Sequence, residues 1–356
     1  MINTIITGSG RYLPERVITN DHFLNHEFYE TTGERVTKTN AETVNKLTEI
    51  TGIAERRYAK PKQKASDLAF LAAQKAIKAA NLDVETLDYI IVAHNFGDVI
   101  NGSNRVDIMP SLASRVKHKL AIKNPECVCY DISFGCPGWV QAMIQGHFYI
   151  QSGEAKKVLV IGAETLSRVV DPHDRDSMIY ADGAGATVIE GKEEATPRGI
   201  LSHATRTDTL QEAYYLWNGK SYNKEACQQQ YYIKMHGRKL YKYAVKNVPP
   251  TVKKCIEKAG LDVQDVSKVL VHQANEKLDE GIIKNFFRLY GIREVPKDVM
   301  PMCIEKMGNN SVATVPVLYD LIQKKELNGH HFESGNNLIF ASVGAGMNVS
   351  TLLYRV

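Results

Sequence analysis

The sequence repeats itself at an interval of about half its length, and this repeat restricts the fold more than any other feature. Residues 75–92 read KAIKAANLDVETLDYIIV, and residues 254–271 read KCIEKAGLDVQDVSKVLV in the same register without a gap. Each copy predicts a helix, a turn at Asn81 or Gly260, a short linker and an apolar strand. Amphipathic patterns also converge by chance, but the shared register favours a duplication.

A second pair of segments supports two related halves. The runs AKKVLVIGAE (155–164) and NNLIFASVGAG (336–346) are almost continuously apolar, as expected of strands that are covered on both faces. The polar stretch between the halves indicates a boundary, with one half spanning 1–195 and the other 196–356. We therefore predict a layered α/β fold in which the halves share central helices, with the active site where their strand ends meet.

Composition and charge exclude several classes of protein. The 356 residues carry 44 Lys+Arg and 40 Asp+Glu, and a net charge of +4 is too balanced for a dedicated nucleic-acid binder. No apolar run approaches the roughly 18–20 residues of a membrane helix, and no secretory signal is visible. The six cysteines are too few for a disulfide scaffold, and no second pair or histidine cluster completes a zinc site. We expect a cytoplasmic protein with neither a metal nor a membrane segment.

One stretch shows no clear periodicity. Residues 206–232 are rich in tyrosine and glutamine and predict an irregular excursion from the layered fold. A surface insertion is the favoured interpretation, and a lid or an interface is the alternative.

The strongest candidate nucleophile is Cys136, in the segment YDISFGCPGWVQAMIQGHFYI. An apolar strand ends there, a turn of small residues follows, and Pro137 is favoured at a first helical position. The apolar residues after it recur at helical spacing: Val140, Met143, Ile144 and Phe148. A cysteine at this helix N-terminus is expected to have a lowered pKa and to act as a nucleophile. The alternative is a small, buried apolar side chain.

Two further segments offer partners for this cysteine. His272 follows a buried strand of the repeat, in KVLVHQANEKL, so the strand delivers it to a sheet edge. Asn309, in MGNNSVATVPVLYDLI, precedes an apolar helix and offers an amide N–H to a developing oxyanion, with helix capping as the alternative role for this turn. The glycines of SVGAGMN (342–348) permit a backbone N–H to approach a reacting atom.

The motifs SFGCPGW, VHQAN, MGNNSVAT and SVGAG, in this order, resemble β-ketoacyl-acyl carrier protein synthase III of the thiolase superfamily. The resemblance covers essentially the whole chain, including GSGRYLPERVITN at the start, DPHDRDSMIYADGAGATVIE at the end of the first half and MHGRKLYKYAV after it. It implies a homodimer with a five-layered αβαβα fold and no cofactor.

The resemblance also implies the reaction. Cys136 takes an acyl group as a thioester, and His272 and Asn309 hold the malonyl thioester carbonyl while carbon dioxide leaves. The enolate then attacks the acyl group in a Claisen condensation with malonyl-acyl carrier protein, which initiates type II fatty-acid synthesis. The backbone N–H groups of Cys136 and Ala345 form the second oxyanion hole.

The substrate-binding positions depart from the family pattern. Lys46 stands where the family often has a tryptophan that stacks on the adenine of coenzyme A, whereas its stacking partner Arg168 is retained. The acyl donor is therefore left open between acyl-coenzyme A and acyl carrier protein. Met109, before a Pro-Ser pair, matches the residue that sets acyl length across the dimer. Lys277 and Arg238 match a basic surface for the acidic carrier protein, or simply form a solvated helix face.

Three other readings compete with a fatty-acid initiator. A specialised condensing enzyme of secondary metabolism, of the pigment, polyketide or quinolone type, would use carrier-bound acyl groups and stays open. A hydroxymethylglutaryl synthase-like enzyme requires a glutamate where this chain has Asn95, so that carboxylate is expected to be absent. A non-catalytic partner subunit would not be expected to retain Cys136, His272 and Asn309 together.

Overall fold

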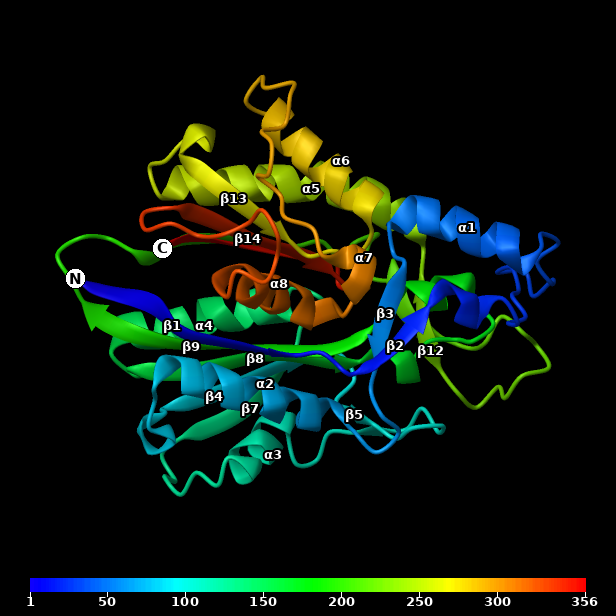
Figure 1. Ribbon diagram of the computed structural model, residues 1–356, viewed down its shortest axis with the longest axis horizontal. Coiled ribbons are helices and arrows are strands. Elements are labelled where there is room, and N and C mark those ends of the chain that lie inside the picture. The colour runs from blue at the N-terminus through cyan, green and yellow to red at the C-terminus, as the bar shows by residue number, and fades with distance from the viewer.

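The fold consists of two β-sheets with helices between them and on their outer faces (Figure 1). The computed structural model describes all residues, 1–356. The first sheet has the strand order β1-β9-β8-β4-β7 and the second the order β10-β15-β14-β13. The strands of the first sheet are β1 (Ile2–Tyr12), β4 (Tyr89–His94), β7 (Val128–Ser133), β8 (Lys157–Thr165) and β9 (Asp182–Glu193). Those of the second are β10 (Gly199–Thr207), β13 (Val266–Val271), β14 (Asn337–Gly344) and β15 (Asn348–Arg355).

Helices form the other three layers. The central layer holds α4 (Gly138–Ser152) and α8 (Thr314–Gln323), which contact strands of both sheets. The outer layers hold α2 (Ala65–Ala80) and α3 (Leu112–Lys119) on the first sheet, and α5 (Gly237–Lys258) and α6 (Glu276–Arg288) near the second. The predicted five-layered αβαβα architecture is therefore confirmed.

The central helices are apolar on more than one face because sheets cover them from both sides. Trp139, Val140 and Met143 of α4 are each at most 1% exposed, and they share one core with Leu318 of α8 and Phe340 of β14. Burying each such side chain stabilises the fold by about 1.5–3 kcal/mol. This packing fixes where the N-terminal ends of α4 and α8 lie.

The repeated segments adopt the same structure in both halves. In the first, α2 ends at Asn81 in the left-handed region, then the 3-10 helix η2 (Val84–Thr86) leads into β4. In the second, α5 is followed by Gly260 at φ 68°, the 3-10 helix η5 (Val263–Asp265) and β13. β4 pairs in parallel with β8, and β13 pairs in parallel with β14. The expected boundary at 195/196 lies between β9 and β10, the last strand of one sheet and the first of the other.

The smaller elements gather at one end of the layers, to the right in Figure 1. Two-stranded pairs there are β2 (Arg16–Thr19) with β3 (Glu55–Tyr58), β5 (Asp98–Val99) with β6 (Val106–Asp107), and β11 (Leu216–Gly219) with β12 (Tyr232–Met235). The remaining helices are α1 (Asn40–Thr51), α7 (Ile304–Met307), η1 (Asn20–Phe23), η3 (Leu166–Arg168), η4 (Arg175–Ile179) and η6 (Ser311–Ala313).

The excursion at 206–232 lies mostly exposed or half-buried at the surface, as a surface insertion would, and it is anchored to the first half. It contains strand β11 and the loop to β12. Strand β12 begins at the last residue of the excursion and continues to Met235. On β12, the buried Lys234 ammonium lies 2.6 Å from an Asp171 oxygen and 3.0 Å from Asp174. It also lies 3.3 Å from the ring centroid of Tyr222. Because leaving any of these buried charges unpaired is costly, the ion pairs hold the hairpin in place.

None of the helices combines the length and apolar composition that crossing a membrane requires. All six cysteines are free, and no group of three His, Cys, Asp or Glu side chains is arranged to hold a metal ion.

Candidate active site

Cys136 lies in the turn between β7 and the central helix α4. The helix begins at Gly138, so Pro137 is its N-cap, whereas the sequence predicted Pro137 as the first helical residue. Gly135, with φ 66°, makes the turn that brings Cys136 to the end of the helix. The thiol therefore stands where the first sheet and the central layer meet.

The environment of the thiol is less favourable to a thiolate than the sequence predicted. Burial raises the pKa of Cys136 to about 11, and the buried carboxyl group of Glu164 acts in the same direction. A hydrogen bond from Ser311 Oγ, at 3.3 Å, opposes them. Desolvation of the charged form outweighs the helix N-terminus here, so the expected lowering of the pKa is wrong for the free protein.

His272 directly follows β13, and its backbone N–H donates to the carbonyl of Ala341 at 2.8 Å. The residue is 2% exposed, and burial lowers its pKa to about 4. The imidazole is therefore neutral near pH 7. Its Nδ1 has no hydrogen-bond partner within the protein.

Asn309 is held by backbone hydrogen bonds on both sides. Its N–H donates to Ile179 O at 3.0 Å, and its carbonyl accepts from Ala181 N at 2.8 Å. The side-chain Oδ1 accepts from Ser311 N at 2.9 Å. Because the amide oxygen is used within the turn, the amide NH₂ is the group left to donate to a ligand.

The structure brings the three residues to the wall of one cavity, which we call the His–Asn cavity: Cys136, His272 and Asn309 line it together. Cys136 also lines a second space of about 220 Å³, which we call the apolar cavity. Most of its lining is hydrophobic, and Leu216 and Trp217 of the excursion form part of its wall. The thiol thus stands where two cavities meet, both lined mostly by hydrophobic residues, and the roles of the three residues remain predictions.

The turn that carries Ala345 packs directly against the turn that carries Cys136. A Cβ atom placed on Gly135 would lie 2.8 Å from Ala345 N, and one on Gly344 would lie 2.5 Å from Cys136 N. Only glycine permits this approach, since real Cβ contacts are not so short. The two backbone N–H groups predicted to form an oxyanion hole therefore belong to adjoining turns.

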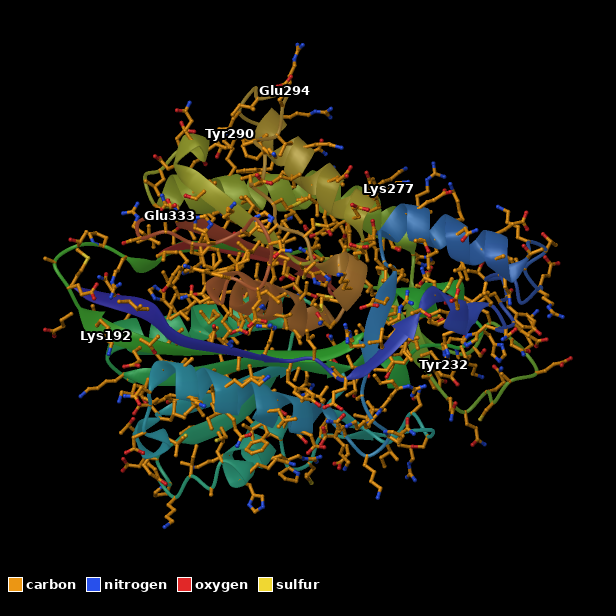
Figure 2. All side chains as sticks on the ribbon, in the orientation of Figure 1. Lys192, Tyr232, Lys277, Tyr290, Glu294 and Glu333 are labelled. Atoms are coloured by element: carbon orange, nitrogen blue, oxygen red, sulfur yellow. The ribbon has the colours of Figure 1, made fainter.

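A groove lined by Lys46, Arg238 and Lys277 leads to the His–Asn cavity, with which it shares the lining residues Tyr241 and Asn275. Figure 2 shows Lys277 at the end of α6 that adjoins α1. Lys38 and Arg175 add further positive charge to the groove; we call this set of five basic residues the basic mouth.

Two of the predicted binding residues lie elsewhere. Arg168 is only 9% exposed, and its guanidinium donates to the backbone carbonyls of Val99 at 2.7 Å and Lys60 at 3.0 Å. It lines neither cavity, because these loop carbonyls already occupy its donors. Met109 is 86% exposed and lies outside both cavities of this chain.

Sequence reasoning missed a buried carboxylate near the nucleophile. Glu164, at the end of β8, is 1% exposed, and burial raises its pKa to about 7. It accepts a hydrogen bond from Asn95 N at 2.8 Å and a second from the Asn95 amide. The position expected to lack a glutamate does hold Asn95, and the Glu164 carboxyl group lies behind it, separated from Cys136 by that residue. The signal was present in VLVIGAE, where a charged residue ends an apolar run.

Comparisons with known proteins show which family and which fold this chain resembles. Residues 130–209 match the family described as 3-Oxoacyl-[acyl-carrier-protein (ACP)] synthase III, and residues 256–356 match its C-terminal domain. The chain is 31% identical, over 99% of both chains, to a beta-ketoacyl-[acyl-carrier-protein] synthase III of Staphylococcus haemolyticus. It resembles the crystal structure of 3-oxoacyl-[acyl-carrier-protein] synthase III from Aquifex aeolicus, with a TM-score of 0.78, 31% identity and coverage of 99% and 100% of the two chains. The Thermus thermophilus enzyme gives a TM-score of 0.81 at 26% identity, covering 99% of each chain.

Proposed function

The chain belongs to the β-ketoacyl-[acyl-carrier-protein] synthase III family, and from that premise we propose that it condenses an acyl thioester with malonyl-acyl carrier protein. This reaction opens type II fatty-acid synthesis. One observation carries the assignment of the residues: Cys136, His272 and Asn309 line the same cavity although they come from three distant segments.

In the first half-reaction, the Cys136 sulfur attacks the carbonyl carbon of the acyl thioester. The carbon–sulfur bond of the donor breaks, and the acyl group stays on Cys136 while the donor leaves as a thiol. The backbone N–H groups of Cys136 and Ala345 would stabilise the oxyanion of the tetrahedral intermediate. The apolar cavity next to the sulfur provides room for the acyl chain.

In the second half-reaction, the malonyl thioester loses its carboxylate as carbon dioxide, and the electron pair moves onto the thioester carbonyl. His272 and Asn309 would each donate a hydrogen bond to the oxygen that becomes negative. The lowered pKa of His272 supports this role, because a neutral imidazole donates without giving up its proton. The enolate carbon then attacks the acyl carbonyl and releases Cys136.

Acyl carrier protein is the partner that we propose for the basic mouth. Carrier proteins of this pathway are acidic, and complementary charge steers and orients such a partner. Arg238 and Lys277 are exposed at the groove that leads to the His–Asn cavity. A carrier docked there would extend its thioester toward Cys136.

We also propose that two copies of the chain associate through the first sheet. Its edge strand β7 has no neighbour on one side, and Val128 on it is 47% exposed. The adjoining loop exposes further apolar side chains: Val106 by 51%, Ile108 by 61% and Met109 by 86%. A second copy would cover this edge and these side chains, which are otherwise liable to aggregation.

Intact-protein mass spectrometry tests the proposed function. The protein is mixed with short and long acyl groups on coenzyme A and on carrier protein, and malonyl-acyl carrier protein is then added. We expect an acyl adduct on Cys136 that is discharged as a β-ketoacyl product. Adducts only from carrier-bound or long acyl groups would instead favour a specialised condensing enzyme, and the absence of any adduct would overturn the proposal.

A further inference from the structure

A continuous chain of hydrogen bonds connects the Cys136 sulfur to the buried Glu164 carboxyl group. Ser311 Oγ lies 3.3 Å from Cys136 Sγ, and Asn95 Nδ2 lies 2.9 Å from Ser311 Oγ. The same Nδ2 donates to Glu164 Oε1, which also accepts from Asn95 N at 2.8 Å. Four residues from four separate segments are thus connected in one line.

The direction of each hydrogen bond in this chain follows from the chemistry of the groups. A carboxylate only accepts, so Glu164 requires the NH₂ side of the Asn95 amide. An amide NH₂ only donates, so Ser311 Oγ must accept from Asn95. The single Ser311 proton is then free to point at the Cys136 sulfur, and a donor at that place stabilises a thiolate.

We propose that Glu164, Asn95 and Ser311 act together as positioning residues, which orient the Ser311 hydroxyl so that it donates to the Cys136 sulfur. The backbone of Ser311 supports this function, because it holds a φ of 51°, which non-glycine residues seldom adopt. Such strain persists only where the surrounding structure maintains it. Here the Asn309 amide oxygen, which accepts from Ser311 N at 2.9 Å, contributes to holding it.

The proposal depends on Glu164 being ionised. A protonated carboxyl group donates as well as accepts, so the Asn95 amide is no longer held in one orientation. If the amide turns, its oxygen accepts from Ser311, and the sulfur loses its donor. The raised pKa of Glu164, about 7, places this change near neutral pH.

The other charged groups facing Glu164 have their own partners. His94, on β4, favours the charged form, and its Nε2 lies 3.0 Å from an Asp131 oxygen. Asp182, on β9, disfavours it and accepts from Ala59 N at 2.6 Å. The Cys136 thiol is the remaining titratable group that interacts with Glu164. Asn95 is the residue that hydrogen-bonds Glu164 directly.

The first test measures alkylation of the half-buried Cys136 by iodoacetamide in the full-length protein, resolved by peptide mass spectrometry because the exposed Cys227 also reacts. At pH 8 we expect Ser311→Ala and Asn95→Ala each to slow alkylation of Cys136 about tenfold, roughly 1.4 kcal/mol in the stability of the thiolate. The double variant should be no slower than either single variant, because both changes interrupt one chain. Multiplying effects, or an unchanged rate for Asn95→Ala, would overturn the proposal.

Ser202→Ala is the matched control. Ser202 Oγ lies 3.4 Å from the sulfur of Cys255, a second buried Ser–Cys pair between β10 and α5. This variant removes a comparable hydroxyl far along the chain from Cys136, so the alkylation rate of Cys136 should not change. Thermal unfolding followed by circular dichroism establishes that each variant is folded.

The second test is the pH profile, in which two mechanisms predict opposite results. If Glu164 positions the Ser311 hydroxyl, protonation of Glu164 below about pH 7 removes this donor from the Cys136 sulfur. The logarithm of the alkylation rate then falls with decreasing pH by more than one unit per pH unit. If Glu164 acted only through its negative charge, its protonation would remove a repulsion and favour the Cys136 thiolate. The logarithm of the rate would then fall by less than one unit per pH unit. Glu164→Gln does not titrate, so its profile should keep a slope of one whichever way the Asn95 amide is turned. A flattened profile in the unmodified protein would overturn the proposal.

This inference rests on the proposed role of Cys136 as the nucleophile, but the two fail in different experiments. Alkylation requires no thioester. If no acyl donor modifies Cys136, the proposed function fails and the alkylation data still report on the hydrogen-bonded chain. If Cys136 is acylated and all variants are alkylated at the unmodified rate, only the inference fails.

Discussion

The Ser311 hydroxyl donates to the sulfur of Cys136 across 3.3 Å, although 175 residues separate them in the chain. Cys136 precedes the central helix α4, and Ser311 begins the 3-10 helix that leads into the central helix α8. The contact therefore joins the corresponding helix starts of the two halves. It exists because the halves pack their central helices side by side.

Replacing the proposed nucleophile should abolish condensation. Cys136→Ala removes the sulfur that would carry the acyl group, so we expect product formation to fall by at least about a thousandfold. Condensation of an acyl thioester with malonyl-acyl carrier protein is the measurement. Cys227→Ala, at an exposed cysteine, is the control and should retain full activity. Condensation by the Cys136 variant at the unmodified rate would refute the assignment.

His272→Ala should separate the two half-reactions. The imidazole is proposed to stabilise the enolate and not to activate the thiol, so acylation of Cys136 should persist. Release of carbon dioxide from malonyl-acyl carrier protein should fall about 100–1,000-fold, as after loss of one oxyanion donor. Intact mass and carbon dioxide release measure the two steps. If acylation and carbon dioxide release fell equally, His272 would instead be assigned to activation of the Cys136 thiol.

The buried imidazole of His272 should also make stability depend on pH. Its pKa is about 4 in the folded protein and 6.5 ordinarily, so the unfolded chain binds more protons between these values. The stability from the neutral imidazole is present above pH 6.5 and is lost as the pH falls toward 4, by up to about 3 kcal/mol. In urea unfolding, His272→Gln should therefore lose less stability than the parent between pH 7 and pH 4.5. The exposed His331→Gln should behave as the parent, and a parallel decline in all three would contradict the prediction.

Asp279 should reduce stability at neutral and alkaline pH. It is fully buried in α6, neither carboxylate oxygen has a hydrogen-bond partner, and burial raises its pKa well above the ordinary value. The folded state therefore retains a proton that the unfolded chain releases, and stability falls as the pH rises above about 4. Asp279→Leu should raise the free energy of unfolding by about 1–3 kcal/mol at pH 8 and by less at pH 5. Glu280→Gln, exposed on the same helix, is the control, and a lower stability of Asp279→Leu at pH 8 would refute the prediction.

The basic mouth should govern the affinity for carrier protein more than the chemical step. Charge reversal in Arg238→Glu or Lys277→Glu should raise the KM for malonyl-acyl carrier protein about tenfold and change kcat little. The effect should shrink at high salt, since exposed charges are screened. Lys192→Glu is the control, because Figure 2 shows Lys192 at the opposite end of the molecule from Lys277. A KM that does not change in Arg238→Glu and Lys277→Glu would place the docking surface elsewhere.

Much of the fold was predictable from the sequence by itself. Local periodicity and backbone preference depend on neighbouring residues, so they can be read from the sequence. They predicted the repeat at 75–92 and 254–271, the apolar strands and the turn before α4. The ordered motifs around Cys136, His272 and Asn309 indicated the family, and the structure places those residues on one cavity.

The tertiary structure decided what depends on packing between distant segments. Burial raises the pKa of Cys136 where the helix N-terminus alone predicted a lower one, because desolvation depends on what covers the thiol. Arg168 gives its donors to the carbonyls of neighbouring loops, and the excursion contributes Trp217 to the apolar cavity. Glu164 stands behind Asn95 because β8 and β4 pair in one register. Neither a contact across two strands nor the desolvation of a thiol follows from the residues next to it in sequence, so only the folded chain determines them.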